Sequence, residues 1–166
     1  MQTPQRKPGK YSNIKPDANI TKEKYHSLQY RLEKLIKHSR PQAAEEVKRL
    51  AADGDFSENH AYQMAKGRLR GINSRISEIE DHLKRAIIIQ SPQNNDKAQL
   101  GHRVYVDVGG KEKCYLILGP SETDPENNII SYLSPLGKLL IGKKAGETAV
   151  LVINGQEKKY LLKKIE

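Results

Sequence analysis

The chain has 166 residues, enough for one medium-sized domain or two small ones with modest cores. Its 29 Lys and Arg residues outnumber the 20 Asp and Glu residues, and the formal charge of +9 favours an anionic partner such as RNA, DNA or a nucleoprotein assembly. The chain has one cysteine, so no disulfide can form within it, and a reducing compartment fits. No stretch approaches the roughly 18 apolar residues of a membrane span. We therefore expect a cytoplasmic protein with no membrane partner.

Residues 1–19 combine Pro, Gly, Asn, Lys and Arg with almost no bulky apolar side chains. Such a segment cannot bury enough apolar surface to offset the entropy lost on ordering. We therefore expect a flexible basic tail.

An amphipathic helix is predicted after this tail, with Thr21 as its N-cap. Its apolar residues recur at three- and four-residue spacings, at Tyr25, Leu28, Leu32 and Leu35. Beyond Pro41 the apolar positions resume one residue out of phase, at Ala43, Val47 and Leu50. Because proline removes a backbone donor and clashes with the preceding turn, we expect a kink or a short break there.

A second helix carries the most regular pattern in the sequence. Its apolar positions alternate steps of three and four residues, at Tyr62, Ala65, Leu69, Ile72, Ile76, Ile79, Leu83 and Ala86. This is typical of a coiled-coil seam. Because the connection at residues 53–57 is short, the helices should lie antiparallel. The sequence predicts a coiled-coil hairpin over residues 20–90, projecting as an arm of about 45 Å.

The pattern changes to a period of two after a turn-rich linker at residues 91–96. Alternating segments at 104–108, 114–118, 129–133, 149–153 and 160–165 predict a small antiparallel sheet. The dipeptide Asn154-Gly155 is a strong hairpin signal. Residues 134–142 interrupt the alternation and predict a short helix packed across the sheet. We therefore expect an α+β fold, with the sheet domain at residues 97–166.

Two carboxylates lie three residues apart at the expected tip of the hairpin, on Asp55 and Glu58. Together they could share a hard divalent cation and position a water molecule on it. Two ligands are too few for a self-contained site, so a partner would have to supply the others. The same spacing also fits a capping box, with Asp55 as N-cap and Glu58 at the third helical position. Both interpretations are open, and they are compatible.

The tip sequence Gly54-Asp55-Phe56-Ser57-Glu58-Asn59-His60-Ala61-Tyr62 resembles the tip motif of the Gre transcript cleavage factors, GreA and GreB. A second segment, residues 134–147, resembles a Ser-Pro and Gly-Lys segment in the C-terminal, FKBP-like domain of that family. Residues 20–25 also fit the start of the family's first helix. The resemblance covers residues 20–166.

This resemblance implies a monomeric accessory factor of bacterial RNA polymerase that is not itself an enzyme. The coiled coil would enter the secondary channel and stimulate the polymerase to cut backtracked nascent RNA. Asp55 would be the metal-side carboxylate and Glu58 would orient the water, with Mg²⁺ held jointly with the polymerase. Ser134, Pro135 and Leu136 would belong to the edge that docks on the polymerase.

Further side chains near the tip are candidates for contact with RNA or the channel. At the tip these are Phe56 and Asn59, and on the return helix Lys66, Arg68 and Arg70. Phe56 could equally fold back on the hairpin end, and the basic residues could be an ordinary solvated flank of a coiled coil. The basic residues lean towards the GreB pattern, but GreA-like and GreB-like subtypes both stay open.

The sequence departs from the family pattern at His60, Ala61 and Leu133. Three other classes of function are also considered for this sequence. A non-catalytic regulator of the channel would share the arm but would not need the Asp55 and Glu58 pair. A general coiled-coil nucleic-acid-binding protein would explain the charge but not the tip motif. A prolyl isomerase would need an aromatic pocket, whereas residues 97–166 hold no Phe or Trp.

Overall fold

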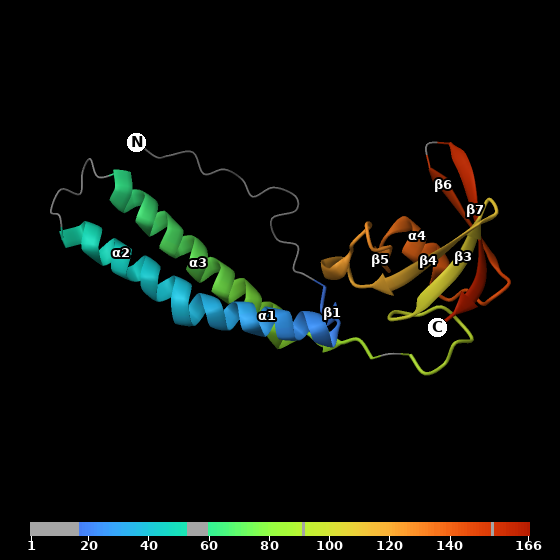
Figure 1. Ribbon diagram of the computed structural model, residues 1–166, viewed down its shortest axis with the longest axis horizontal. Helices are drawn as coiled ribbons and strands as arrows, with labels where there is room; N and C mark the ends of the chain where they lie inside the picture. Colours follow the sequence, from blue (N-terminus) through green and yellow to red (C-terminus); the bar gives the residue numbers. More distant parts are fainter. Residues whose placement is uncertain (1–16, 53–59, 91, 154) are drawn as a thin grey trace.

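A long helical hairpin is followed by a small sheet domain in the computed structural model (Figure 1). The structure describes residues 17–52, 60–90, 92–153 and 155–166. The helices run side by side away from the sheet domain, which lies beyond their base (Figure 1). This arrangement confirms the predicted α+β class.

The hairpin is built from two helical arms, of which the first is interrupted by a wider turn. Its elements are β1 (Asn19–Ile20), α1 (Lys22–Lys34), a π-helical turn (Leu35–Ser39), α2 (Arg40–Ala52), α3 (His60–Arg85) and β2 (Ile87–Ile88). The short strands β1 and β2 pair in parallel and join the two ends of the hairpin at its base.

The predicted seam lies between the arms. Ala65, Ile76 and Ile79 of α3 are buried, as is Ala43 of α2. The other predicted seam residues of both arms are half-buried. Because one stripe on each arm covers the other, the hairpin stabilises itself mainly by apolar burial along its length.

The first arm stays helical across Pro41, and its regular α-helix is interrupted just before the proline. The π-helical turn at Leu35–Ser39 precedes the proline, and the N–H of Arg40 donates to the carbonyl of Leu35. A π-turn accommodates one extra residue, which accounts for the one-residue phase shift of the seam. It also widens the helix next to the carbonyl of Lys37, which the ring of Pro41 would otherwise crowd.

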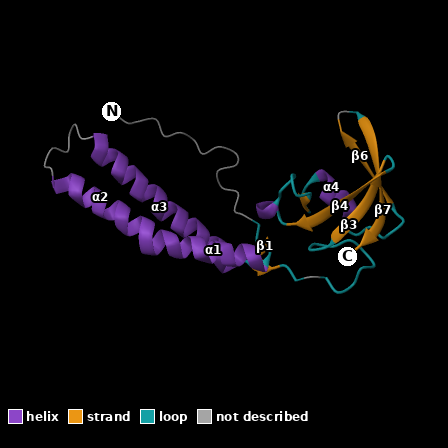
Figure 2. Ribbon diagram, viewed as in Figure 1, coloured by secondary structure: helices purple, strands orange, loops and turns teal. Residues whose placement is uncertain are grey.

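The sheet domain has five strands in the order β5-β4-β3-β7-β6 (Figure 2). Its elements are β3 (Arg103–Val108), β4 (Lys111–Leu118), a 3₁₀ turn (Pro120–Glu122), β5 (Ile129–Ser131), α4 (Pro135–Leu140), β6 (Thr148–Ile153) and β7 (Gln156–Ile165). The sheet differs from the antiparallel expectation at one edge, where β5 runs parallel to β4. The reason is the connection over residues 119–128, which is not a hairpin turn. It carries the chain back along β4 so that Ile129, the first residue of β5, pairs with Leu116.

Helix α4 covers one face of the sheet and completes the core. Val104, Val106, Ile117 and Leu140 are fully buried there. A β-carbon on Gly137 of α4 would lie 2.0 Å from the carbonyl oxygen of Ser131. Only glycine therefore lets α4 approach β5 this closely.

Hydrogen bonds between four residues, Asp17, Thr21, Glu122 and Tyr132, join the base of the hairpin to the sheet domain, and we call them the base contact. The N–H of Thr21 donates to Oε2 of Glu122 over 2.8 Å, and its hydroxyl donates to Oε1 of the same carboxylate. The hydroxyl of Tyr132 donates to Oδ2 of Asp17 over 2.6 Å. Thr21 is also the predicted N-cap of α1, since its oxygen accepts from the N–H of Lys24. One side chain thus starts the arm and attaches it to the sheet domain.

Asp17 takes part in this contact as a carboxylate. Burial favours the neutral form of Asp17. Hydrogen bonds from Tyr132 and from the backbone and side chain of Asn19 favour the charged form, and together they outweigh the effect of burial. The pKa of Asp17 therefore lies below its usual value. Residues 1–16 of the expected basic tail lie outside the described residues, whereas Asp17 and Asn19 are placed and bonded at the hairpin base.

His102, the residue just before β3, is fully buried. Its Nδ1 accepts a hydrogen bond from the N–H of Gln99 over 2.9 Å, which holds the preceding turn. Burial lowers the pKa of His102 below its ordinary value of 6.5, because the imidazolium ion would lose its hydration.

We expect this histidine to make the protein less stable in mild acid. The unfolded chain takes up the proton near pH 6.5, while the folded chain takes it up only at lower pH. The free energy of unfolding should therefore fall as the pH drops from 6.5 through the folded pKa, by about 1.4 kcal/mol for each unit of pKa depression. Urea unfolding between about pH 7.5 and about pH 5.5 measures this slope.

A His102→Asn variant should flatten the slope, because Oδ1 of asparagine can still accept from Gln99 but cannot titrate in this range. The matched control is His26→Asn, which removes an exposed imidazole on α1. Equal slopes in His102→Asn and the wild type would contradict the assignment.

Candidate functional site

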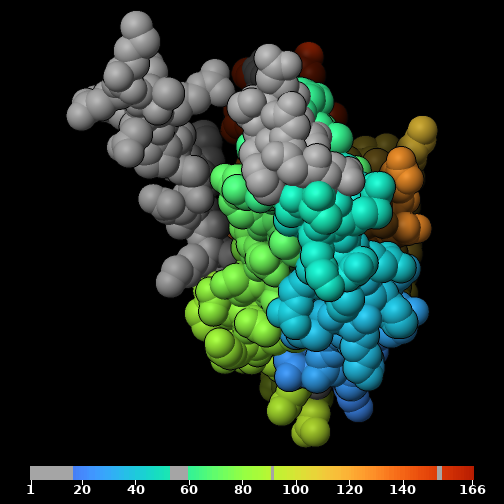
Figure 3. Space-filling view, turned by 90° about the vertical axis from the view of Figure 1, so that its left-hand side faces the viewer, coloured from blue at the N-terminus to red at the C-terminus, as the bar shows by residue number. Residues whose placement is uncertain are grey.

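The predicted tip lies between the end of α2 at Ala52 and the start of α3 at His60. Asp55, Phe56, Glu58 and Asn59 belong to residues 53–59, which lie outside the described residues. Their catalytic, metal-binding and contact roles, and the capping-box alternative, stay predictions. The structure does place the two helix ends that flank them at the far end of the arm, which faces the viewer in Figure 3.

Two of the candidate basic residues lie on one side of α3 near this end. Lys66 and Arg70 are four residues apart, so they share a helix face. The ammonium of Lys66 lies 5.2 Å from the centre of the Tyr62 ring, a cation–π geometry. Arg70 is exposed and forms no hydrogen bond or ion pair with another described residue. Both cations are therefore accessible to an anionic partner.

Arg68 points in a different direction. Its Nη1 lies 2.6 Å from Oε2 of Glu46 on α2, and this ion pair bridges the two arms. The side chain of Arg68 is 61% exposed, so solvent screens the pair and its contribution to stability is small. The structure thus separates Arg68 from Lys66 and Arg70, and the three do not form one continuous track.

Two glycines, Gly67 and Gly71, open the exposed surface of α3 beside these cations. A β-carbon at either position would have no heavy atom within 4 Å. Both are exposed and four residues apart on one helix face. Neither glycine is needed for packing within the described structure.

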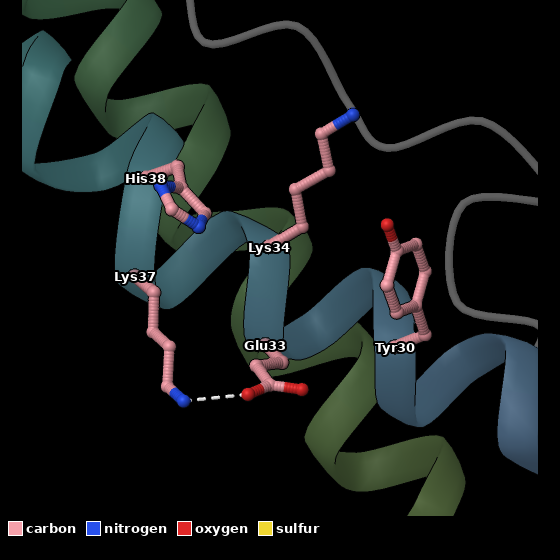
Figure 4. A pocket seen from close by; sticks show the side chains of 5 residues that line it. All are labelled: Tyr30, Glu33, Lys34, Lys37 and His38. Carbon is pink, nitrogen blue, oxygen red and sulfur yellow. Dashed lines mark hydrogen bonds and ion pairs between the residues drawn. The ribbon is translucent and has the colours of Figure 1, made fainter.

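A hollow on the outer face of the first arm was not anticipated from the sequence. It has a volume of about 280 Å³ and is lined by Tyr30, Glu33, Lys34, Lys37 and His38 (Figure 4). Nζ of Lys37 donates to Oε1 of Glu33 over 2.5 Å, and this bond holds the pKa of Glu33 below its usual value. Tyr30 and Lys34 point away from that pair (Figure 4). The only sequence signal was an aromatic residue, Tyr30, outside the seam.

The three docking candidates of the sheet domain have separate structural roles. Ser134 caps α4, accepting from the N–H of Gly137 over 3.0 Å and donating to the carbonyl of Ser131 over 2.6 Å. Leu136 packs against the core. Pro135 is exposed at the first position of α4, and Leu133 beside it is 47% exposed. Among residues 133–136, Leu133 and Pro135 are therefore the ones exposed to a partner.

Within the described ranges, no group of three or more His, Cys, Asp or Glu side chains is arranged to hold a metal ion. The same part of the chain contains no helix that is both long and apolar enough to cross a membrane.

Replacing Gly67 or Gly71 by alanine should stabilise the hairpin. Alanine favours a helix interior over glycine by about 0.8–1.0 kcal/mol, and the added β-carbon meets nothing at either position. For a chain of this size, each substitution should raise Tm by about 2–4 °C. Thermal unfolding followed by circular dichroism measures the change.

Gly137→Ala is the matched control, because there the new β-carbon would collide with the carbonyl of Ser131. This variant should lower Tm. A decrease in Tm for Gly67→Ala or Gly71→Ala would contradict the expectation that a β-carbon is accommodated at these positions.

Two family models match this architecture in turn. The model described as "Transcription elongation factor, N-terminal" matches residues 18–88, and "Transcription elongation factor, GreA/GreB, C-term" matches residues 93–166. The boundary between the two matches lies between the hairpin and the sheet domain.

Sequence relatives are similar to this chain over most of its length. The transcription elongation factor GreA of Thermomicrobium roseum is 38% identical over 130 residues, covering 77% of this chain and 83% of that protein. GreA of Nautilia profundicola is 37% identical over 150 residues, covering 88% and 92%.

Solved structures that resemble the chain include GreA factor homolog 1 of Thermus thermophilus, with 24% identity, a TM-score of 0.42 and coverage of 90% of this chain and 99% of the other. A GreA/GreB factor from Nitrosomonas europaea has 18% identity, a TM-score of 0.40 and coverage of 90% and 98%. The family models and the sequence relatives together span the hairpin and the sheet domain. The chain therefore belongs to the GreA/GreB family of transcription elongation factors.

Proposed function

We propose that this protein binds bacterial RNA polymerase, inserts the hairpin into the secondary channel and stimulates cleavage of backtracked nascent RNA. Family membership implies the polymerase as partner and an accessory role rather than independent enzyme activity. The stimulation of cleavage is our inference from the tip residues. Its cellular setting would be the cytoplasm, where a bacterial polymerase works.

One observation carries the proposal. The arm uses its apolar stripe on itself, and the acidic pair Asp55 and Glu58 falls in the segment between its two helix ends. An arm of this kind has no core-forming surface left for another domain of its own chain. Its remaining use is to carry the residues at its end to a distant site.

Asp55 and Glu58 supply the kind of oxygen ligand that Mg²⁺ prefers. A divalent ion bound there would polarise a phosphate oxygen and favour the hydroxide form of a bound water. Two carboxylates are insufficient to hold the ion firmly, so we expect weak Mg²⁺ binding by the free protein. Asp55 would contribute a ligand, and Glu58 would accept a hydrogen bond from the attacking water.

Lys66 and Arg70 would contact the RNA backbone from one side of α3. Both are exposed and lie within about three turns of its start at His60, so they could follow RNA leaving the tip. Arg68 would contribute less, because its charge is already balanced by Glu46. Phe56 and Asn59 would complete the surface at the tip.

Asp55→Asn and Glu58→Gln should each abolish stimulated RNA cleavage while leaving polymerase binding close to wild type. Both changes keep the size of the side chain but remove the charge that a metal ion and an attacking water require. The measurement is the shortening of labelled RNA in backtracked elongation complexes with Mg²⁺. A Ser57→Ala variant serves as a control within the same segment.

Full cleavage by both variants would contradict the catalytic assignment and leave the capping box as the role of the pair. Polymerase binding by the wild type without any cleavage would instead indicate a non-catalytic channel regulator. Cleavage of free RNA without polymerase would indicate a self-contained nuclease.

Pro135→Glu should weaken polymerase binding by about tenfold, the effect typical of losing one central interface side chain. Pro135 is exposed, whereas Ser134 and Leu136 are needed for the cap and the core. Glutamate is also well tolerated in the first turn of a helix, so the fold should persist. Binding to core polymerase by fluorescence anisotropy, together with Tm, tests this expectation.

Ala145→Glu is the charge-matched control, since it places the same charge at an exposed position in the loop after α4. It should leave the affinity unchanged. Equal affinities of Pro135→Glu and the wild type for polymerase would contradict the proposal that the start of α4 belongs to the docking surface.

A further inference from the structure

Strand β6 is an unprotected edge of the five-stranded sheet (Figure 2). It pairs with β7 on one side, and no other described strand lies beside it. Its sequence, Thr-Ala-Val-Leu-Val-Ile, contains no charged residue, proline or glycine. Natural edge strands are usually short, charged or interrupted, because their free N–H and C=O groups can pair with another chain. None of these protections applies to β6.

Besides its unpaired backbone edge, β6 has exposed apolar side chains. Val150 is 41% exposed and Val152 is 60% exposed on the face of the sheet opposite α4. Their cross-strand neighbours on β7, Lys159 and Glu157, are exposed as well. The far half of the β6–β7 hairpin therefore extends beyond the core as a two-stranded ribbon, which is a marginally stable arrangement by itself. The opposite edge differs, because β5 has three residues and follows a turn held by Asp124.

We propose that β6 pairs with β6 of a second copy of this chain, antiparallel across a two-fold axis, and so joins the two sheets. Antiparallel pairing of a strand with itself is isologous, so it closes as a dimer rather than growing into a filament. With the axis at Leu151, Val150 lies opposite Val152 of the partner subunit. Since β6 carries no charge, this register places no like charges directly opposite each other on the two paired strands.

Two charges on β7, those of Lys159 and Glu157, complement this register. On the exposed face of the joined sheet, Lys159 of β7 lies beside Val150 of β6. Val150 then lies opposite Val152 of the partner subunit, which lies beside Glu157 of the partner subunit. The two rows that pass through the valines thus end in opposite charges. The apolar stems of the lysine and glutamate side chains can lie over the valine pairs and shield them from water.

The size of this contact sets its strength. A single edge of six residues buries less than the roughly 1,000 Å² expected of a stable interface. The dimer should therefore form only at high concentration, with a Kd between about 10 µM and about 1 mM. The monomer expected from the sequence would be the species at lower concentrations.

Sedimentation equilibrium of the full chain from about 10 µM to about 500 µM tests the proposal over this range. The wild type should shift from monomer towards dimer, and Val152→Lys should stay monomeric throughout, because lysine is a typical edge-protecting residue. Ile87→Lys is the control, since Ile87 is 59% exposed on the hairpin base, away from the sheet edge. It should dimerise like the wild type. A wild type that stays monomeric at about 500 µM, or a dimer that persists in Val152→Lys, would overturn the proposal.

Hydrogen exchange separates loss of pairing from loss of folding. In the wild type, amides of β6 should exchange more slowly at high than at low protein concentration, while those of β4 should not change. Val152→Thr, which keeps a β-branched side chain, should weaken the dimer at least twofold with an unchanged far-ultraviolet spectrum. Exchange of β6 that is independent of concentration would exclude β6 as the interface.

Discussion

Two helices that bury their apolar stripe against each other leave no continuous apolar stripe for a third element, and this limits what the hairpin can do. The buried alanines and isoleucines of the seam, such as Ala65 and Ile76, belong to the hairpin alone. The sheet domain must therefore be built around its own core, with Val104, Val106 and Leu140 at its centre. The division into an arm and a separate sheet domain follows from this limit, and it allows the far end of the arm to act at a distance from the sheet domain.

Hydrogen bonds help to fix how the arm meets the sheet domain. The carboxylate of Glu122 receives both the N–H and the hydroxyl of Thr21, and Asp17 receives the hydroxyl of Tyr132. A β-carbon on Gly119 would lie 2.4 Å from the carbonyl oxygen of Asn19, so the backbones approach as closely as glycine permits. Tyr132 and the exposed Leu133 are adjacent, which places the attachment of the arm next to the proposed docking surface.

Local patterns predicted much of this molecule. The seam of the hairpin, the cap at Thr21 and the strands of the sheet follow from spacing and residue type, which one sequence displays directly. Contacts between distant residues could not be read in this way. The bond between Thr21 and Glu122, residues 101 positions apart, has no local signal, and neither does the ion pair of Arg68 with Glu46. The parallel pairing of β5 with β4 depends on the path of residues 119–128, which no local pattern displays. For the tip, the motif predicts the chemistry of Asp55 and Glu58, but their geometry lies outside the described residues.

The π-helical turn at Leu35–Ser39 has a consequence for how arms of this kind can vary in length. The same five residues correct the phase of the seam and make room for the ring of Pro41. Deleting one residue there would restore a regular helix with its stripe in phase, but the proline would again face a crowded carbonyl. Replacing Pro41 alone would remove the crowding at the carbonyl of Lys37, but the π-helical turn would still be needed to accommodate the extra residue. Single insertions and deletions in the first arm are therefore coupled to the proline, and relatives that lack one of these features should lack the other.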